Sequence, residues 1–267
     1  MHNAAFDHYG VDARYELREI SASDLSSFFA EVRAGGWLGF QVTAPHKQAV
    51  MDFVDSLDPA AAAIGAVNSG ALLADGSLEG FNTDAPGFAA ALTEDLGARI
   101  ESSRVVVAGA GGAARAVVWA LLTGGAEVVT IGNRQPERAV SLAADFAHLG
   151  YTAGVGLEGE DFESSLRNAD IAVNATTMGM TTDTMAFDPA LLPGNAHVFD
   201  LVYVPLVTPL VARARQLELP VRNGLDMLVR QAEIAFERWT GIVGAASVMR
   251  SSLQAWMADS PESTERG

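Results

Sequence analysis

The chain has 267 residues, of which 49% are hydrophobic, and its 17 basic and 33 acidic side chains give a formal net charge of −16. This length favours two domains that share a cleft, and the apolar content is enough to build buried cores. The negative charge argues against nucleic acid as a partner, because neutralising phosphates requires a basic surface. The chain has no cysteine, which excludes disulfides, thiolate catalysis and cysteine-bound metals, and we expect no metal ion in its site.

Neither the first residues nor the most apolar stretch has the pattern of a targeting or membrane segment. The start, MHNAAFDHYG, lacks the apolar run of a signal peptide. The stretch 197–214 is interrupted by Asp200 and two prolines, so it does not predict a membrane span. We therefore expect a cytoplasmic protein that acts on a small molecule, with no nucleic acid and no membrane as partner, present as a monomer or homodimer.

The first third of the chain alternates short apolar runs with helical patterns, which is typical of α/β structure. The apolar runs are 13–20 and 37–44, and the helical patterns are 23–36 and 46–57. The segment 67–84 then predicts two short strands around a turn at Asp75-Gly76. A helix capped by Asp84 follows, and we expect it to connect two domains.

A second series of elements begins at Arg104 and has the pattern of a doubly wound parallel sheet. The predicted strands are 104–109, 127–132, a short strand near Thr152, 171–177, 196–203 and 220–224, and helices are predicted at 114–125 and from Pro136. After Gly224 the sequence predicts only helices, at 225–241 and 245–258, and then a polar tail.

These elements predict an α/β protein of two α/β domains around a cleft. A Rossmann-type, doubly wound dinucleotide-binding domain is expected at 85–224. A split substrate-binding domain is expected at 1–84, to which the helices of 225–267 return.

A glycine-rich turn, GAGGAAR, starts at Gly109 between a predicted strand and a predicted helix. Glycines at such a turn let the backbone approach a pyrophosphate, and the helix N-terminus supplies free N–H donors. The predicted cofactor contacts are therefore Gly109, Gly111, Gly112 and Ala113, although Ala114 stands where a third glycine is usual. A glycine-rich turn without any ligand is the alternative.

The next strand ends in Asn133 and Arg134, with Arg138 one turn later. An NAD-binding unit generally has an acid at this position, which bonds the ribose 2′-hydroxyl. Two guanidinium groups in an acidic chain suit a 2′-phosphate instead, so these residues predict NADP. The alternative is that Arg138 only occupies an exposed helix face.

Polar side chains follow three predicted strands of the first domain. They are Thr43 and Lys47 in VTAPHK, Asn68 in AVNS, and Asn82 and Asp84 in FNTD. Lys47 is the one lysine among 17 basic residues, which indicates a position where the permanently protonated arginine does not substitute. A lysine beside an aspartate suits oxidation of an alcohol, since a proton leaves the oxygen while hydride leaves the carbon. A structural ion pair, or a chance surface lysine, is the alternative.

These segments together resemble the shikimate dehydrogenase family from His2 to about Gly241. VTAPHK resembles the catalytic-lysine segment of that family, IGAVNSG and GFNTD its substrate-binding strand and catalytic-aspartate segment, and GAGGAAR with NRQPER its NADP signatures. NATTMGM, DLVYVPLVTPL and NGLDMLVRQAEIAFERWTG match its later blocks in the same order.

The resemblance implies reversible reduction of 3-dehydroshikimate to shikimate with NADPH, in the shikimate pathway to chorismate and the aromatic amino acids. It implies a Rossmann-type NADP-binding domain beside the split substrate-binding domain. It also implies that Lys47 and Asp84 form the catalytic pair.

Further site residues follow from the same resemblance. Thr43, Asn68 and Gln231 are expected to bond the ring hydroxyls, Tyr203 to lie close to the substrate, and Gly224 to lie near the nicotinamide. Without the resemblance, Asn68 and Gln231 are interpreted as strand-end and helix-surface amides, and Tyr203 as a core aromatic.

The match has departures. Family members usually begin with a strand and a Ser-x-Ser motif that holds the substrate carboxylate, whereas this chain starts at their HNAAF helix, His2 to Phe6. The first ~20 residues of the family pattern are thus missing, which we expect to leave sheet backbone groups unpaired and to remove two hydroxyl donors. Gln41 replaces the usual asparagine, Ser69 the usual threonine, and Asp226 lies where Gly or Pro is common. A quinate- or aminoshikimate-type dehydrogenase, or a catalytically silent NADP-binding relative, is therefore the alternative.

Overall fold

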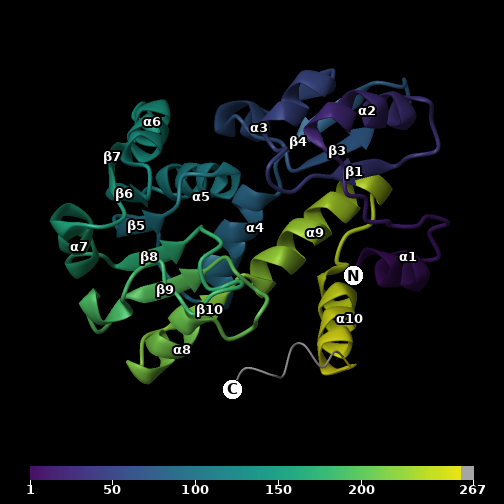
Figure 1. The fold of residues 1–267 in the computed structure, drawn as a ribbon. Coiled ribbons are helices and arrows are strands. Elements are labelled where there is room, and N and C mark those ends of the chain that lie inside the picture. Colours follow the sequence, from purple (N-terminus) through teal and green to yellow (C-terminus); the bar gives the residue numbers. More distant parts are fainter. Residues whose placement is uncertain (260–267) are drawn as a thin grey trace. The chain divides into compact units, whose positions relative to one another are not determined.

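The computed structural model describes residues 1–259, which divide into two compact units (Figure 1). The first unit contains Met1–Pro86 together with the described chain from Val229 onward. The second contains Gly87–Leu228. The polar tail expected at the C-terminus lies outside the described residues.

Six parallel strands form the sheet of the second unit. They are β5 (Arg104–Ala108), β6 (Val128–Asn133), β7 (Tyr151–Gly156), β8 (Ile171–Asn174), β9 (His197–Asp200) and β10 (Val221–Asn223). Their order is β10-β9-β8-β5-β6-β7, so the chain builds outward from β5 on one side and then returns to build outward on the other. The predicted doubly wound α/β fold is confirmed, and its topological switch point lies between β5 and β8.

Helices cover both faces of this sheet. They are α4 (Asp84–Ala90), which continues into the π-helical turn η3 (Ala91–Asp95), α5 (Gly112–Thr123), α6 (Pro136–Phe146), α7 (Glu160–Arg167), the 3₁₀ turn η4 (Pro189–Leu191) and α8 (Pro209–Gln216). On one face, Phe162 of α7 packs in a buried cluster with Val106 and with residues of α8. On the other face, Phe88 of α4 meets Phe199 of β9 edge-on, with 5.3 Å between ring centroids.

The sheet of the first unit has four short strands in the order β1-β3-β4-β2. These are β1 (Gly39–Gln41), β2 (Ser56–Leu57), β3 (Ser69–Leu72) and β4 (Leu78–Phe81). β3 and β4 form the predicted hairpin around Asp75-Gly76, with Leu72 opposite Leu78. β1 pairs antiparallel with β3 and is an edge strand.

The helices of this unit lie on both faces of the smaller sheet, either on the sheet itself or on another helix. They are α1 (His2–Tyr9), η1 (Ala22–Asp24), α2 (Leu25–Arg33), η2 (Ala49–Phe53), α3 (Pro59–Ile64), α9 (Leu225–Thr240) and α10 (Ala246–Asp259). Phe29 of α2 and Phe40 of β1 belong to the core on one face. On the other face, Phe81 of β4 packs against Ala235 and Trp239 of α9. α1 and α10 pack in turn on α9.

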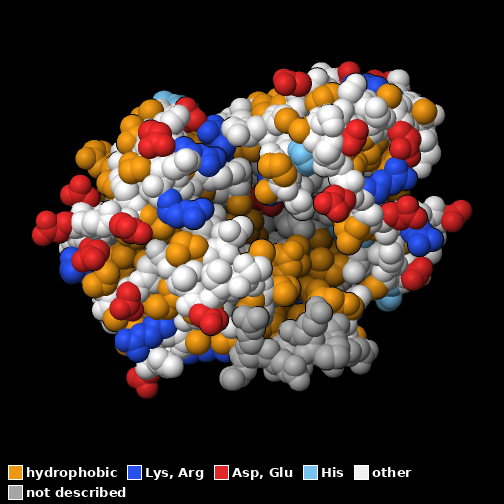
Figure 2. All heavy atoms as spheres, viewed as in Figure 1, with side chains coloured by type: hydrophobic (Ala, Val, Ile, Leu, Met, Phe, Trp, Pro, Cys, Tyr) orange, Lys and Arg blue, Asp and Glu red, His pale blue; other side chains and the backbone are white. Residues whose placement is uncertain are grey.

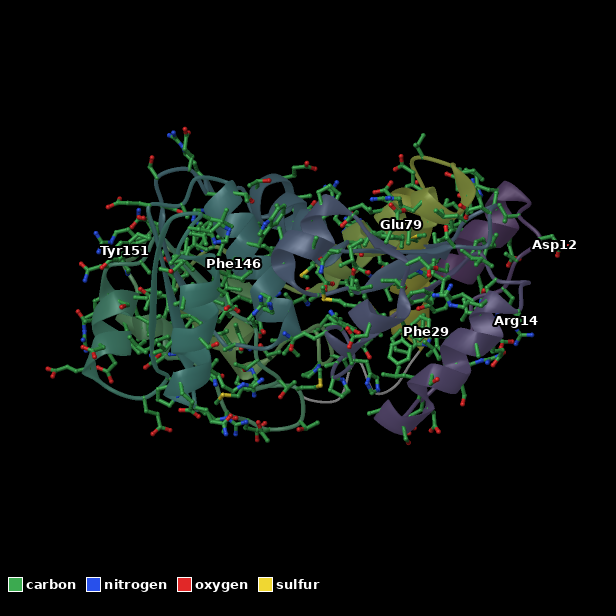
Figure 3. The ribbon with its side chains drawn as sticks, turned by 90° about the horizontal axis from the view of Figure 1, so that it is seen from above. Asp12, Arg14, Phe29, Glu79, Phe146 and Tyr151 are labelled. Atoms are coloured by element: carbon green, nitrogen blue, oxygen red, sulfur yellow. The ribbon has the colours of Figure 1, made fainter. Side chains whose placement is uncertain are left out.

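The apolar run 13–20 does not form a strand, which corrects the sequence expectation. The backbone of Tyr15 explains the difference, because its N–H donates to Asn3 Oδ1 over 2.6 Å and its carbonyl accepts from Asn3 Nδ2 over 3.1 Å. A side chain thus takes the hydrogen bonds that a neighbouring strand would make. Asp12, directly before this run, and Arg14, within it, lie at the outer rim of the unit (Figure 3).

Two other local predictions were also wrong. The helix expected at 46–57 is only the short turn η2, because the Lys47 carbonyl accepts from Val67 N–H and Asp55 N–H donates to the Leu78 carbonyl. Both bonds hold this segment against the sheet. The helix α4 begins at Asp84, but the side chain at its start that accepts a backbone N–H is Asn82, from Ala85 over 3.1 Å.

Among the described residues, no helix is both long enough and apolar enough to cross a bilayer.

Candidate active site

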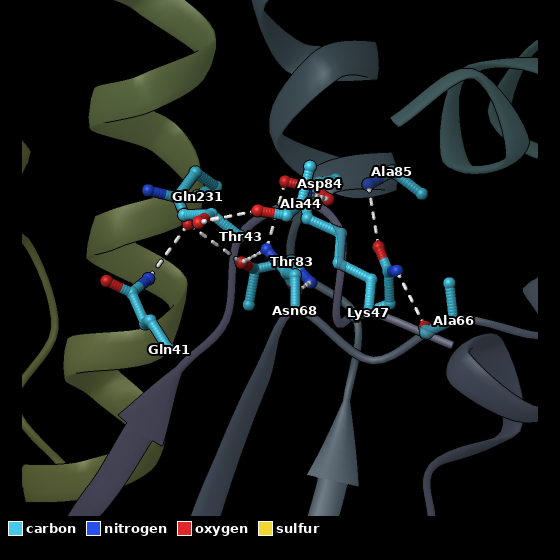
Figure 4. Close-up of polar contacts among 11 residues, drawn as sticks. Gln41, Thr43, Ala44, Lys47, Ala66, Asn68, Thr83, Asp84, Ala85 and Gln231 are labelled. Carbon is cyan, nitrogen blue, oxygen red and sulfur yellow. Dashed lines mark hydrogen bonds and ion pairs between the residues drawn. The ribbon is translucent and has the colours of Figure 1, made fainter. Parts of the chain in front are cut away.

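Lys47 and Asp84 form a largely buried ion pair in the first unit (Figure 4). The loop after β1 carries Lys47, and Asp84 follows β4 at the start of α4. The Lys47 Nζ lies 2.6 Å from Asp84 Oδ2, and the two side chains are only 15% and 7% exposed. Removing these charges from water is costly unless the pair is held by further hydrogen bonds.

Asn68 supplies one of those further hydrogen bonds. Its Nδ2 donates to Asp84 Oδ1 over 2.9 Å, and its Oδ1 accepts the backbone N–H of Thr83 over 2.7 Å. The same Nδ2 lies 2.9 Å from Thr83 Oγ1. Asn68 is 3% exposed and comes directly before β3, so a rigid strand end fixes the second oxygen of the carboxylate.

Gln231 joins this network from α9. Its Oε1 accepts from Gln41 Nε2 over 2.9 Å and from Thr83 Oγ1 over 3.2 Å. The predicted residues Lys47, Asp84, Asn68 and Gln231 therefore lie in one connected set of hydrogen bonds. Gln231 is 9% exposed, so it is not the helix-surface amide of the alternative interpretation.

Thr43 lies on the same loop as Lys47 and is exposed. Its hydroxyl is 3.5 Å from the carbonyl oxygen of Ala44, a long contact that leaves the side chain weakly held. Figure 4 places Thr43 on the same side of the strands as Gln231.

His2 and Tyr15 bond to the outer side of Gln41. The His2 Nε2 lies 3.1 Å from Gln41 Oε1, and the Tyr15 hydroxyl donates to the same oxygen over 2.9 Å. Burial lowers the pKa of the His2 imidazole from 6.5 to about 4, an effect that the Gln41 hydrogen bond opposes and the nearby N-terminal charge reinforces. The His2 Nδ1 has no hydrogen-bond partner among the described residues, so a second proton on this ring would be buried without an acceptor.

The glycine-rich turn lies at the switch point of the second unit. Gly109, directly after β5, has φ +113°, and a Cβ there would approach the carbonyl oxygen of Ala175 to 2.8 Å. Gly111 is the N-cap of α5 and has no side-chain cap bond, and a Cβ on it would meet no atom within 4 Å. Gly112 and Ala113 begin the helix and are partly exposed. The turn therefore offers open space at a helix N-terminus, the geometry that binds phosphate groups.

Asn133, Arg134 and Arg138 lie at the end of β6 and the start of α6. The Asn133 side chain donates to the Gln135 carbonyl over 3.0 Å and so shapes its own loop. Both arginines are exposed, and neither has an acidic partner among the described residues. Basic side chains are visible over the region of α5 and α6 in Figure 2.

Tyr203 and Gly224 belong to the second unit. Tyr203 follows β9 and is 37% exposed, so it is not a core aromatic. Gly224 follows β10 directly, and a Cβ there would overlap the carbonyl oxygen of Leu201. Only glycine fits this close backbone contact.

Sequence reasoning missed four members of the site network: Thr83, Gln41 as a hydrogen-bond partner, Tyr15 and His2. Thr83 is fully buried and stands between the two polar residues singled out in FNTD. Its position in that motif was an available signal. Nothing in the sequence places His2 beside Gln41, which is 39 residues away.

A second buried polar group, in the second unit, was also missed. Asp200, at 0% exposure, accepts from Thr208 Oγ1 over 2.5 Å, from Asn174 Nδ2 over 2.8 Å and from Val202 N–H over 3.1 Å. Burial raises the pKa of this carboxyl, while the three hydrogen bonds act to lower it. The group ties the ends of β8 and β9 to the start of α8.

Three family models match the chain in succession. The shikimate dehydrogenase substrate-binding domain matches residues 1–69, the shikimate/quinate 5-dehydrogenase model matches 91–185, and the shikimate 5′-dehydrogenase C-terminal domain matches 224–254. A shikimate dehydrogenase (NADP⁺) of Symbiobacterium thermophilum is 43% identical over 267 residues, which cover 98% of this chain and 90% of that protein. The chain belongs to the shikimate dehydrogenase family.

Solved structures of the shikimate dehydrogenase family have the same fold. A shikimate 5-dehydrogenase of Thermus thermophilus, in complex with NADP(H) and shikimate, matches with a TM-score of 0.85 at 36% identity, over 95% of this chain and 92% of that one. A quinate dehydrogenase of Corynebacterium glutamicum, in complex with NAD, matches with a TM-score of 0.87 at 32% identity, over 95% and 92%. The family thus includes enzymes that differ in substrate and cofactor while sharing this architecture.

Proposed function

We infer that this protein is an NADP-dependent shikimate dehydrogenase, an oxidoreductase that acts on a CH–OH group and reversibly reduces 3-dehydroshikimate to shikimate. The buried Lys47–Asp84 pair carries this conclusion, because it provides a proton donor and its partner in a member of a dehydrogenase family. The reaction belongs to the shikimate pathway of aromatic amino acid biosynthesis.

Lys47 is the residue that handles the proton. In the direction of reduction, the ketone carbon receives a hydride and its oxygen takes a proton from Lys47 Nζ, which yields the alcohol. In the direction of oxidation, the hydroxyl returns that proton to Nζ as the hydride leaves the carbon. General acid–base assistance of this kind contributes roughly 10²–10⁴-fold to the rate.

Asp84 and Asn68 keep Lys47 in place. Asp84 Oδ2 binds Nζ, and Asn68 holds the opposite oxygen, so the carboxylate cannot rotate without breaking a hydrogen bond. A pre-oriented donor lowers the reorganisation that the reaction requires.

The remaining polar residues bind the substrate. Thr43, Asn68 and Gln231 bond its ring hydroxyls, and their amide and hydroxyl groups match a polyol in hydrogen-bonding capacity. Tyr203, exposed in the second unit, contributes a further substrate contact.

The second unit holds NADP. The N–H groups at Gly111, Gly112 and Ala113 bind the pyrophosphate at the start of α5, and Gly109 gives the backbone its required turn. Asn133, Arg134 and Arg138 surround the adenosine 2′-phosphate, because two exposed guanidinium groups without acidic partners among the described residues suit a dianion. Gly224 lies near the nicotinamide. When bound, the cofactor supplies the hydride donor and acceptor.

This function assigns a role to each part of the chain. Residues 1–84 with 225–267 form the substrate-binding domain, and residues 85–224 form the NADP-binding domain. The enzyme acts in the cytoplasm on small molecules alone, as a monomer or homodimer. Cell fractionation tests the cytoplasmic location, and light scattering of the purified chain tests the oligomeric state.

The rate of NADPH formation from shikimate and NADP tests the function. It is measured on the unmodified chain and on Lys47→Ala, with quinate and NAD as comparison substrates. We expect turnover with shikimate and NADP, a loss of about 10²-fold or more in the variant, and unchanged NADP binding. Faster turnover of quinate would replace the substrate assignment, and NADP binding without any turnover would reject the enzymatic function.

A further inference from the structure

The hydrogen bonds around Gln231 continue away from the reacting pair, through Gln41 to Tyr15 and His2. We propose that Gln41, held by Tyr15 and His2, is a positioning residue that fixes the orientation of the Gln231 amide and thereby sets the affinity for substrate. The proposal rests on the proposed function, in which Gln231 binds a ring hydroxyl.

The direction of the hydrogen bonds in this network is set by the Asp84 carboxylate, which only accepts. Asn68 must turn Nδ2 toward it, and Asn68 Oδ1 then accepts the Thr83 N–H. Because the same Nδ2 also donates to Thr83 Oγ1, the hydroxyl proton of Thr83 is directed to Gln231 Oε1.

The hydrogen bonds from Thr83 and Gln41 fix the orientation of the Gln231 side-chain amide. Its Oε1 accepts from Thr83 at 3.2 Å and from Gln41 Nε2 at 2.9 Å, which occupies both lone pairs of that oxygen. A hydrogen bond from the Gln231 amide to a ligand must therefore come from Nε2. Gln231 acts as a donor toward substrate, and Gln41 is one of the two residues that enforce this.

The orientation of Gln41 is fixed from its other end. Its Nε2 faces Gln231, so its Oε1 accepts from the Tyr15 hydroxyl and from His2 Nε2. His2 must consequently carry its proton on Nε2. The His2 ring stacks on Tyr15 at 4.6 Å and lies 5.1 Å from the ring of Trp239, which limits the movement of both donors.

The residue type at position 41 matters because β1 fixes the backbone. Gln41 pairs with Ser69 of β3, so its Cα cannot shift toward α9 without breaking the sheet. A glutamine at this position spans the distance to Gln231 and still meets Tyr15. An asparagine is one methylene shorter and cannot make both contacts from the same backbone.

The test compares Gln41→Leu, Gln41→Asn and Tyr15→Phe with the unmodified chain, in steady-state kinetics with shikimate and NADP. We expect Gln41→Leu and Gln41→Asn to raise KM for shikimate about tenfold, the value of one hydrogen bond. Tyr15→Phe should raise it about threefold, since His2 remains as a donor. The KM for NADP should stay unchanged, which a general loss of structure would not permit.

Tyr9→Phe is the matched control, because it also removes a tyrosine hydroxyl bond in the first unit, to the Gly244 carbonyl over 3.3 Å. It should leave KM for shikimate unchanged. A thermal unfolding curve on each variant separates misfolding from a kinetic effect, and Tyr15→Phe keeps the test valid if the Gln41 variants fold poorly.

A double-mutant cycle shows whether Gln41 acts through Gln231. In a Gln231→Leu background, the further change Gln41→Leu should alter KM by less than twofold. A full tenfold increase in that background, or no increase in the single variants, overturns this inference while leaving the proposed function intact. Absence of shikimate turnover by the unmodified chain instead rejects the function, and this inference with it.

Discussion

Lys47 Nζ and Asp84 Oδ2 lie 2.6 Å apart although 37 residues separate them in the sequence. The pair forms because the loop after β1 and the start of α4 come together at the same end of a four-stranded sheet. Asp84 stands three residues after β4, and the Lys47 carbonyl accepts the N–H of Val67, two residues before β3, so both residues are tied to the backbone beside the sheet.

Asp84→Asn should lower kcat for shikimate oxidation by about 10²–10⁴-fold, because an amide cannot hold the ammonium of Lys47 as a carboxylate does. The measurement is NADPH formation at saturating shikimate and NADP. Asp75→Asn, at the exposed turn between β3 and β4, is the control and should retain full activity. Equal activity of Asp84→Asn and the unmodified chain would exclude a role for this carboxylate in the reaction.

Arg134→Ala and Arg138→Ala should each raise KM for NADP about tenfold or more, since each removes one charge-assisted contact with the 2′-phosphate. The KM for NAD should not change. Arg167→Ala serves as the control, because Arg167 pairs with Glu163 on the exposed face of α7 in the same unit. Equal losses for NADP and NAD would mean that these arginines act on the structure and not on the phosphate.

The depressed pKa of His2, about 4 against 6.5 in the unfolded chain, makes stability depend on pH. Protonation favours the unfolded state, so this stabilisation is complete above pH 6.5 and is lost as the pH falls toward 4. The shift corresponds to about 3 kcal/mol of unfolding free energy. Urea unfolding at pH 7 and pH 4.5 should show a smaller loss for His2→Gln than for the unmodified chain.

His8→Gln is the control for that experiment, because His8 lies on the same helix but is exposed. It should lose as much stability between the two pH values as the unmodified chain does. If His2→Gln also loses as much, another group is responsible for the acid sensitivity.

The raised pKa of Asp200 makes stability depend on pH in the opposite direction to His2. The folded state favours the protonated carboxyl. The resulting stabilisation is present below the pKa of the unfolded chain and is lost as the pH rises through the pKa of the folded chain. Asp200→Asn should destabilise the protein by about 1–3 kcal/mol, because Thr208 loses its acceptor. Urea unfolding should show a larger destabilisation at pH 3.5, which lies below the unfolded value of 3.8, than at pH 8. Asp188→Asn, at an exposed cap, should show no such difference.

Much of the second unit was predictable from its sequence. Its central strands β5, β6, β8 and β9 are mostly buried, so they appear as continuous apolar runs such as RVVVAG, and glycine or proline marks their ends. Helices α7 and α8 were not predicted from the sequence. In α7 only Phe162 and Leu166 are buried, which leaves too weak a periodic pattern to detect.

The first unit was less predictable because tertiary contacts override its local patterns. The run 13–20 has the composition of a strand, but the Asn3 side chain takes the backbone hydrogen bonds of Tyr15. The site residues followed from motifs: Lys47, Asn68 and Asp84 each follow or precede a strand, and the structure brings them together. Gln41 and His2 were not predictable as partners, because their contact depends on how α1 packs on α9.

Asn3 of α1 bonds both the N–H and the carbonyl of Tyr15, and Tyr15 in turn donates to Gln41. The position of Gln41 at the site therefore depends on helix α1. Helix ends open locally far more often than whole domains unfold, and α1 has only eight residues. Each opening of α1 releases both hydrogen bonds to Tyr15 and moves His2, so the outer support of Gln41 is lost while the rest of the fold persists. Hydrogen exchange at the Tyr15 amide should therefore report how often the substrate site is transiently loosened.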